Sequence, residues 1–501
     1  MKKKKLLPYS WGDLNGYYDL LVTKALQETC NGNYLKSIQC IVSAGFLQYN
    51  LNRLYKDERL EKLLVDIGKS RYKLNDSIGI QKRYVFYDSF GWDNRGLTQQ
   101  YLDALNCLPN SEYIFVFEKI DAERSKHIVQ TLKNADVKIV ELVGDVYSKM
   151  DTFYDLLNVY NPNGVFLHLE PWGVLPLIVL SAFPRITKYM INLTDHAFWL
   201  GSSLLDYSWE FRNYGCTVSL QKRNLRKEQL LLLPYYPIDS GFEEFKGFPI
   251  SIEGKVVMFS GGSFYKIYGA DNFYLSLVAD LLNDNPNLIF IYAGAGDDSI
   301  FRLFMKRRGL ADRVCLLGLR DDINEIFKRI DIYLGTYPYS GGLMSQYAAL
   351  HEKPLLVFSS SGNIVEDEVC TKKYATFSFE NKEDLLDEAH KLIDNVIYRN
   401  ERGRFFASLI AGQGDFRKKF RELLEDNQSK CDYVLSTIDY DNYAERYLRA
   451  INEGYKGFSV EINILKAIGF SVFYQTPKMF FNLLPYFFEK VISFIKSKFF
   501  E

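Results

Sequence analysis

The stretch that decides the fold reads KVVMFSG at residues 255–261, DNFYLSLVADLL at 271–282 and LIFIYAG at 288–294. Short apolar runs predict strands, and the longer run between them, with apolar residues three and four apart, predicts a helix. Further strand candidates lie at 313–318, 331–336 and 354–358, and helix candidates at 299–309, 323–330 and from Leu343. Strands joined through helices pair in parallel, so we expect a doubly wound α/β domain over residues 250–425.

A second alternation of the same kind covers residues 81–245. Its strand candidates are RYVFYD at 83–88, YIFVFE at 113–118, VKIVEL at 137–142, GVFLHLE at 164–170, KYMINLT at 188–194, CTVSL at 216–220 and LLLLPYYP at 230–237. The segment near 238–253, which joins the two alternations, lacks the apolar periodicity of a helix or strand, as linkers do. With 501 residues the chain is long enough for two cores. We therefore expect two Rossmann-like domains with a ligand-binding cleft between them.

Helical segments are expected at both ends of the chain, over residues 1–80 and 426–501. The first of these offers no recognisable chemistry. Within 478–500, apolar and mostly aromatic residues recur three and four positions apart, with lysines elsewhere around the helix. Such a helix can lie on a membrane surface, or it can pack on the N-terminal helices or on a second subunit in a homo-oligomer.

Composition narrows the class of protein. The 61 basic residues nearly balance the 62 acidic ones, so no nucleic-acid partner is expected. Neither the start MKKKKLLPYSWGDLNG nor any later segment has the apolar length of a signal peptide or a membrane span. The seven cysteines have no framework spacing, which suits a reducing compartment. We expect a cytoplasmic protein, or one that lies peripherally on the inner face of a membrane.

The sequence does not indicate a metal site. No C-x-x-C pair is present, and no D-x-D motif lies on a loop that follows a strand. Asp439 and Asp441 have the D-x-D spacing but fall in an expected helical region. We therefore assign no metal and expect no cofactor.

Two loops after strands of the second domain can bind a diphosphate. In the first, Gly261 and Gly262 let the backbone approach a phosphate and Lys266 can place a cation on it, although an ordinary glycine-containing turn also explains this loop. The second, residues 337–345, opens a helix whose first N–H groups and dipole form an anion site. The two loops together are a more specific signal than either alone.

The segments GGSFYKIYG (261–269), RVCLLGLRDDINEIFKRIDIYLG (313–335) and PYSGGLMSQYAALHEKPLLVF (338–358) resemble the donor-binding half of glycosyltransferases with the GT-B fold. Within that fold the nearest pattern is that of protein O-GlcNAc transferases and bacterial N-glycosyltransferases. The resemblance implies a GT-B chain that uses a nucleotide-diphosphate sugar, with a UDP-sugar as the expected donor. It also implies that helices near 431–453 cross back to the first domain.

The resemblance assigns donor-binding roles within the second domain. Residues 341–344 would bind the β-phosphate, Lys266 would neutralise the leaving diphosphate, and the nucleobase would lie near residues 317–319. Glu366 resembles the acid that meets ribose or sugar hydroxyls, although a solvated acidic turn explains it equally well. The implied residues are Gly261, Gly262, Lys266, Leu317, Gly318, Leu319, Gly341, Gly342, Leu343, Met344 and Glu366.

The sequence departs from the family pattern around the predicted helix. Leu343 and Met344 stand where the family has paired threonines, and Tyr347 stands where it has a ribose-binding acid. Retaining GT-B families carry two glutamates eight positions apart in this region, and Tyr339 and Tyr347 take those places here. The second departure weakens the case for a retaining reaction, so an inverting reaction is expected, and the lack of a D-x-D motif on a strand-end loop favours a reaction without metal.

An inverting transfer needs a base for the proton of the acceptor hydroxyl. His196, with Asp195 beside it in the loop after strand 188–194, is the first candidate, because an ordinary imidazole pKa near 6.5 suits the task. Many GT-B enzymes similarly place a functional histidine on the first domain. Asp195 is the second candidate. Alternatively, His196 only caps the strand end.

The loop after the first strand, residues 88–96, is where GT-B enzymes keep a glycine-rich loop on the acceptor side. By this resemblance Gly91, Asp93 and Arg95 are candidates for contact with acceptor or donor sugar. A turn followed by a helix cap explains the same residues.

Glycosyl transfer in the assembly of cell-surface polysaccharide or glycoprotein glycans is the leading hypothesis. The acceptor would be a glycan, a lipid-linked glycan or a protein. Two alternatives remain: a catalytically degenerate GT-B subunit that supports an active partner, and a nucleotide-sugar epimerase, which can share this fold.

Overall fold

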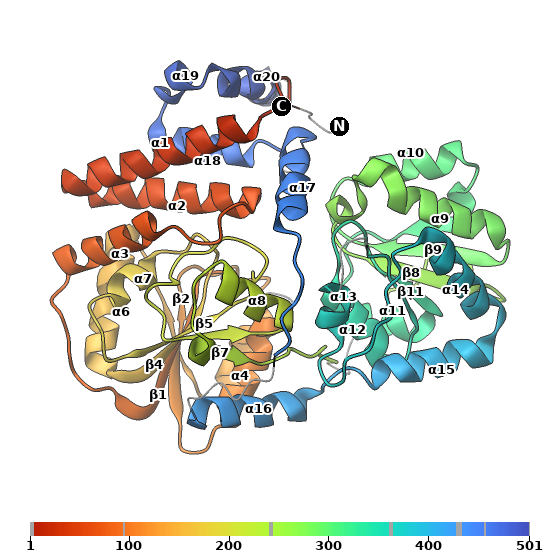
Figure 1. The fold of residues 1–501 in the computed structure, drawn as a ribbon, viewed down its shortest axis with the longest axis horizontal. Coiled ribbons are helices and arrows are strands. Elements are labelled where there is room, and N and C mark those ends of the chain that lie inside the picture. Colours follow the sequence, from red (N-terminus) through yellow and green to blue (C-terminus); the bar gives the residue numbers. More distant parts are fainter. Residues whose placement is uncertain are drawn as a thin grey trace.

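The computed structural model describes residues 5–93, 96–239, 244–359, 364–426, 433–454 and 457–499. The chain forms two parallel sheets, each flanked by helices, with a further group of terminal helices beside the first sheet (Figure 1). Within the described ranges, no helix combines the length and the apolar character needed to cross a membrane.

The first sheet has seven parallel strands in the order β3-β2-β1-β4-β5-β6-β7. Its strands are β1 (Ile80–Asp88), β2 (Glu112–Phe117), β3 (Lys138–Glu141), β4 (Pro162–His168), β5 (Thr187–Ile191), β6 (Tyr207–Glu210) and β7 (Leu230–Leu232). The helices between them are α4 (Leu97–Asn106), α5 (Lys126–Asn134), α6 (Val146–Tyr160), α7 (Leu175–Leu180) and α8 (Asn213–Gln221), with a 3₁₀ turn at Lys227–Gln229. Central β1 is exposed where it starts and fully buried over residues 84–88, where side chains must be apolar or hydrogen-bonded.

The second sheet has five parallel strands in the order β10-β9-β8-β11-β12. Its strands are β8 (Val256–Gly261), β9 (Leu288–Ala293), β10 (Val314–Leu316), β11 (Ile332–Leu334) and β12 (Leu355–Leu356). The helices are α9 (Phe273–Asp284), α10 (Ser299–Arg307), α11 (Ile323–Arg329), α12 (Gly342–Leu350), α13 (Ile364–Val369), α14 (Lys382–Asp394) and α15 (Val396–Ala407), with 3₁₀ turns at Phe264–Ile267, Ala270–Asn272 and Ala311–Arg313. Every strand and helix predicted for this half is present, and the doubly wound fold class is confirmed.

The N-terminal helices α1 (Trp11–Cys30), α2 (Tyr34–Leu51) and α3 (Glu58–Arg71) complete the core of the first sheet. Leu21 and Ile41 are fully buried in one apolar cluster with Val165 of β4. A capping box between Ser10 and Asp13 sets the start of α1. The segment predicted as a helical appendage is therefore helical, but it shares its core with the sheet.

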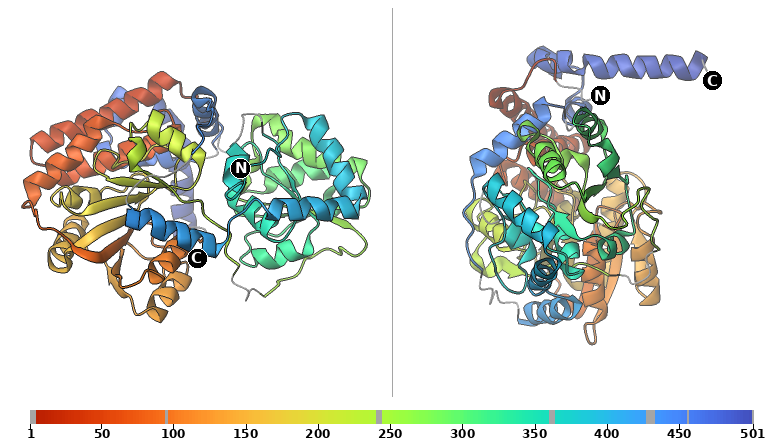
Figure 2. Two further views of the ribbon diagram at one scale, coloured as in Figure 1. Left: turned by 60° about the horizontal axis from the view of Figure 1, so that its bottom comes forward. Right: turned by 90° about the vertical axis from the view of Figure 1, so that its right-hand side faces the viewer.

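Five helices follow the second sheet: α16 (Gln413–Asp426), α17 (Tyr440–Asn452), α18 (Ser459–Ile468), α19 (Val472–Gln475) and α20 (Pro477–Phe499). Helix α16 returns to the first sheet, where the Phe420 ring lies 5.0 Å from that of Trp209. Helix α18 packs against α2, and α20 extends away from the body of the protein (Figure 2). The chain thus crosses between its two halves twice.

One strand prediction is wrong. CTVSL at 216–220 lies in α8, and the strand of this region is β6, which precedes it. Residues 214–219 are all buried, so the run has no polar face that would reveal a helical period. A short, wholly buried apolar run cannot be assigned to strand or helix by periodicity.

Candidate active site

Two loops at the carboxyl ends of β8 and β11 are held together by Lys266. Its Nζ donates a hydrogen bond to the Ser340 carbonyl oxygen at 2.7 Å, and the Tyr339 N–H donates to the Lys266 carbonyl oxygen at 3.3 Å. Lys266 lies in the 3₁₀ turn after β8, and Ser340 lies just before α12. The two loops that the sequence singled out are therefore in direct contact.

Glycines let these loops approach each other. A Cβ atom on Gly261 would lie 2.7 Å from Cε of Met344, and one on Gly342 would lie 2.5 Å from a Glu368 carboxylate oxygen. Gly341 is the N-terminal cap residue of α12 and provides no side chain to bond the first-turn N–H groups. The first N–H groups of a helix lack partners within it, so residues 342–344 present donors and the positive end of the helix dipole.

The strand-end loops of β9 and β10 lie beside the first of these loops. The Gly294 N–H donates to the Gly318 carbonyl oxygen at 2.8 Å, and the Leu317 N–H donates to the Tyr292 carbonyl oxygen at 2.8 Å. A Cβ on Gly294 would collide with the Gly262 carbonyl oxygen. Leu319 is 81% exposed. The predicted nucleobase and phosphate regions thus form one continuous edge of the second sheet.

Asp195 and His196 lie in the turn after β5, in the other half of the chain. Asp195 is fully buried, and Nε and Nη2 of Arg212 bond its two carboxylate oxygens at 2.6 and 2.9 Å. Burial by itself raises the pKa of Asp195, but the charge and hydrogen bonds of Arg212 outweigh burial and lower the pKa to about 2. Asp195 is therefore ionised, and both of its carboxylate oxygens are bonded to Arg212. Nδ1 of the half-buried His196 ring lies 3.4 Å from the Asp195 carboxylate.

Arg212 joins the turn after β5 to the loop before α12. Its Nη1 lies 2.6 Å from the Glu368 carboxylate, which also accepts the Ser340 hydroxyl at 3.0 Å. Both Arg212 and Asp195 are buried, and Glu368 is nearly so. An unbroken chain of contacts, Asp195 to Arg212 to Glu368 to Ser340, therefore connects the two halves of the candidate site.

Sequence reasoning missed Arg212. It follows β6 directly, but β6 was not predicted because the neighbouring run CTVSL was interpreted as the strand. With β6 assigned, the rule that ligands lie at the carboxyl ends of strands would have drawn attention to this arginine.

Glu366, the predicted contact for donor hydroxyls, points into the second half of the chain. It is fully buried and accepts the N–H groups of Phe377 and Ser378 at 3.2 and 2.7 Å. Its neighbours take the contacts at the cleft: Asp367 accepts Asn213 Nδ2 at 2.8 Å and the N–H of Tyr214. At this edge Asp367 and Glu368, rather than Glu366, therefore make the contacts with the first half of the chain.

The loop after β1 has structural contacts of its own. Gly91 has φ of 75°, and a Cβ there would collide with the Lys119 carbonyl oxygen. Asp93 accepts Gln99 Nε2, and burial raises the pKa of its carboxyl group. Arg95 lies outside the described residues. These contacts agree with the turn-and-cap alternative for the loop.

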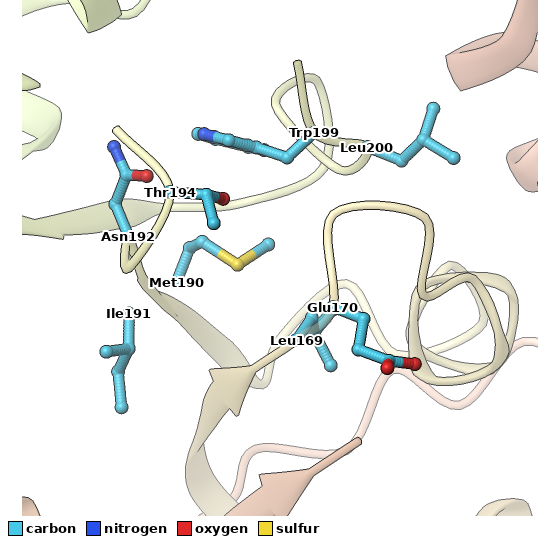
Figure 3. Close-up of a pocket in the computed structure, with 8 residues that line it drawn as sticks. All are labelled: Leu169, Glu170, Met190, Ile191, Asn192, Thr194, Trp199 and Leu200. Atoms are coloured by element: carbon cyan, nitrogen blue, oxygen red, sulfur yellow. The ribbon is translucent and has the colours of Figure 1, made fainter. Parts of the chain in front are cut away.

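Two small pockets lie at the carboxyl edge of the first sheet. The first sits at the ends of β4 and β5, where the Trp199 ring lies above Thr194 and Met190 (Figure 3). It is lined by Leu169, Glu170, Met190, Ile191, Asn192, Thr194, Trp199 and Leu200. The second lies between the two halves of the chain and is mostly polar, with Phe211, Arg212, Asn213, Leu232, Pro234, Asp367, Cys370, Thr371, Lys372, Lys373 and Tyr374 in its walls.

The described residues contain no group of three or more His, Cys, Asp and Glu side chains arranged to hold a metal ion. Asp439, one of the two D-x-D aspartates, caps α17 by accepting the Asn442 N–H at 3.0 Å. Its position is therefore explained by the helix start.

No family model and no curated protein matches this sequence. Solved structures do match in fold. HepE of Anabaena, solved with UDP and glucose, is 14% identical with a TM-score of 0.51, and the match covers 69% of this chain and 100% of HepE. The chain has the GT-B fold. A mutant O-GlcNAc transferase of Thermobaculum terrenum (14% identity, TM-score 0.51) matches over 87% of this chain and 85% of its own. A glycosyltransferase of Rickettsia africae is 10% identical with a TM-score of 0.53, and the match covers 70% of this chain and 100% of the Rickettsia chain.

Proposed function

We propose that this GT-B chain is a glycosyltransferase that moves a sugar from a UDP-sugar to an acceptor hydroxyl. The observation that carries the proposal is the contact between Lys266 and the loop that opens α12. It brings a cation and a helix N-terminus to one point, where they can stabilise the charge that develops on a leaving diphosphate. In support, HepE has the same fold and is solved with UDP and with UDP-glucose.

The proposed reaction is a single displacement with inversion. His196 Nδ1 faces Asp195, which leaves Nε2 to accept the proton of the acceptor hydroxyl. The acceptor oxygen bonds to the anomeric carbon as the bond from that carbon to the diphosphate oxygen breaks. Lys266 and the first-turn N–H groups of residues 342–344 receive the leaving negative charge. Asp195 acts as a positioning residue.

The setting that we propose is the assembly of cell-surface polysaccharide or glycoprotein glycans, on the cytoplasmic side of a membrane. The acceptor would be a glycan, a lipid-linked glycan or a protein, bound against the first sheet. The turn after β5 supports this side for the acceptor, because it carries the proposed base His196.

One observation favours a second candidate, a subunit without transferase activity. The Glu368 carboxylate accepts the Ser340 hydroxyl and lies against Gly342, next to the expected position of the diphosphate. A carboxylate there repels a phosphate unless it stays paired with Arg212. The departures at Leu343, Met344 and Tyr347 support the same candidate.

Metal-free thermal unfolding with millimolar UDP, GDP, ADP or CMP tests the proposal. We expect UDP to raise Tm by about 2–4 °C, because a ligand that binds only the folded state stabilises it by mass action. Lys266→Ala should abolish the rise. Lys306→Ala, which removes an exposed lysine of α10, is the matched control and should respond like the wild type.

Release of UDP from a UDP-sugar in the presence of an acceptor mixture completes the test. Release that requires the acceptor, and that His196→Asn reduces by about 100-fold or more, supports transfer. An epimerase would convert the donor without releasing UDP. If no nucleotide stabilises the wild type, the proposal is wrong and the non-catalytic subunit takes its place.

A further inference from the structure

The two ends of the chain form one structural unit at a pole of the molecule. Leu7 and Asn482 of α20 exchange two hydrogen bonds of 2.8 Å, and Lys5 Nζ lies 2.5 Å from the buried carboxylate of Glu461 in α18. Figure 1 shows α18, α19 and the start of α20 beside α1 at this pole. The N-terminal segment is thus anchored on the terminal helices.

This pole presents aromatic side chains to solvent. Phe470 is 71% exposed, Tyr474 93%, Phe481 47% and Phe488 64%. Rings of Phe470, Phe473, Phe480 and Phe481 follow one another with centroids 5.2 to 6.0 Å apart. We call Phe470, Tyr474, Phe480, Phe481 and Phe488 the aromatic ridge. Five exposed aromatic residues along α20, α19 and the turn before α19 are unusual on a protein surface in contact with water and mark an interaction site.

The opposite face of α20 is already occupied. Met479 and Leu483 are fully buried in the core that contains α1 and α2, and Asn482 is buried in its bonds to Leu7. One side of α20 therefore anchors the helix, and the other side carries Phe480, Phe481 and Phe488 outward. Beyond this contact the helix continues away from the body (Figure 2).

Positive charge accompanies the ridge. Lys466 of α18 and Lys490 of α20 are exposed. Glu461, an acidic residue of the same pole, is buried and paired with Lys5, and Asp13 is paired with Lys478 at 2.7 Å. Lys466 and Lys490 therefore place exposed positive charge beside the aromatic ridge.

We propose that the aromatic ridge docks on the surface of a lipid bilayer that contains anionic lipids. Aromatic side chains are favoured at the boundary between headgroups and acyl chains, and each lysine near an anionic surface adds about 1 kcal/mol of attraction. A second copy of the chain fits less well, because a two-fold contact through the ridge would bring the exposed Lys466 and Lys490 of both copies together. This inference does not depend on the proposed enzymatic activity.

Co-sedimentation of the full chain with vesicles tests the docking. We expect binding to vesicles of phosphatidylcholine with phosphatidylglycerol, and binding weaker by about tenfold to phosphatidylcholine alone or in 0.5 M salt. The variant with Phe470→Ser, Tyr474→Ser, Phe481→Ser and Phe488→Ser should lose at least about tenfold in affinity. The matched control is Val396→Ser with Ile397→Ser on α15, which removes exposed apolar residues far from the ridge and should bind as the wild type does.

A charge variant tests the electrostatic part of the docking by itself. Lys466→Glu with Lys490→Glu, which reverses two exposed charges, should reduce binding to the anionic vesicles by about 100-fold without changing thermal unfolding. Wild-type protein that does not sediment with anionic vesicles overturns the proposal, as does a ridge variant that binds as well as the wild type. A wild-type dimer in light scattering that the ridge variant converts to monomer also overturns it, in favour of self-association.

Discussion

Arg212 bonds acidic residues from both halves of the candidate site. It is buried, and it neutralises Asp195 from one half of the chain and Glu368 from the other. Two carboxylates can be buried this close together only because the guanidinium bonds both. At the scale of single residues, this arginine links the proposed base to the proposed phosphate site.

Replacing Arg212 should therefore destabilise the folded protein. We expect Arg212→Met to lower the free energy of unfolding by about 3–5 kcal/mol, since it leaves two buried carboxylates without the guanidinium that neutralises them. Urea unfolding followed by circular dichroism measures the change. Arg185→Met removes an exposed arginine that is paired with the equally exposed Asp76, and it should lower the free energy of unfolding by less than about 1 kcal/mol. Equal effects of the two substitutions would contradict the role given to Arg212.

The pH dependence of stability gives a second prediction for the same cluster. The pKa of Asp195, about 2 in the folded protein, lies below its ordinary value of 3.8. The ionised carboxylate therefore contributes stability that is complete above about pH 4 and is lost as the pH falls towards 2. Between pH 5 and pH 3 the wild type should lose about 1 kcal/mol more than Asp195→Asn. The same loss in both proteins would show that Asp195 does not titrate in this way.

At the scale of elements, α16 determines how the chain returns to the first half. Phe416 and Phe420 are buried on the first sheet, in contact with Tyr101 and Trp209, and Arg417 is paired with Asp103 of α4 at 2.7 Å. The polar remainder of α16 faces outward, which gives it the amphipathic pattern of a surface helix.

The packing of α16 on the first sheet should depend on Phe420. We expect Phe420→Ala to lower the free energy of unfolding by about 3–5 kcal/mol, because it removes a fully buried ring and leaves a cavity. Leu303→Ala on α10, where the side chain is half exposed, serves as a control and should change the free energy of unfolding by less than about 1 kcal/mol. Urea unfolding of the three proteins gives the comparison. A small effect of Phe420→Ala would mean that α16 adds little to the core.

At the scale of the whole molecule, the two halves meet through polar contacts. The start of α8 bonds Asp367 and Glu368 of α13, and Tyr339 before α12 approaches α17, where its hydroxyl lies 3.5 Å from the Arg446 carbonyl oxygen. Interfaces of this polar kind permit relative motion of domains. A ligand that changes the conformation of the loop before α12 can therefore also change the conformation or mobility of the first half of the chain.

Hydrogen exchange should reveal this coupling. UDP is expected to slow exchange in residues 262–269 and 336–345, which would touch it, and also in residues 192–201, which connect to them through Arg212 and Glu368. In Glu368→Gln the protection of 192–201 should fall by about fivefold or more, while that of 262–269 persists. Mass spectrometry of peptides covers all three regions. Unchanged protection of 192–201 in the variant would mean that the ion pair does not carry the coupling.

The sequence by itself determined the doubly wound halves and the loops of the second sheet, because apolar alternation and glycine spacing are local properties of the chain. Lys266 and residues 341–344 could be selected because they follow strands whose pattern is clear. Only the tertiary structure decided that 216–220 is a helix, since burial on all sides hides its period. It also decided that Glu366 points inward while Glu368 meets Arg212, because two positions along a helix differ by about 200° and the packing of α13 sets which side faces the other half.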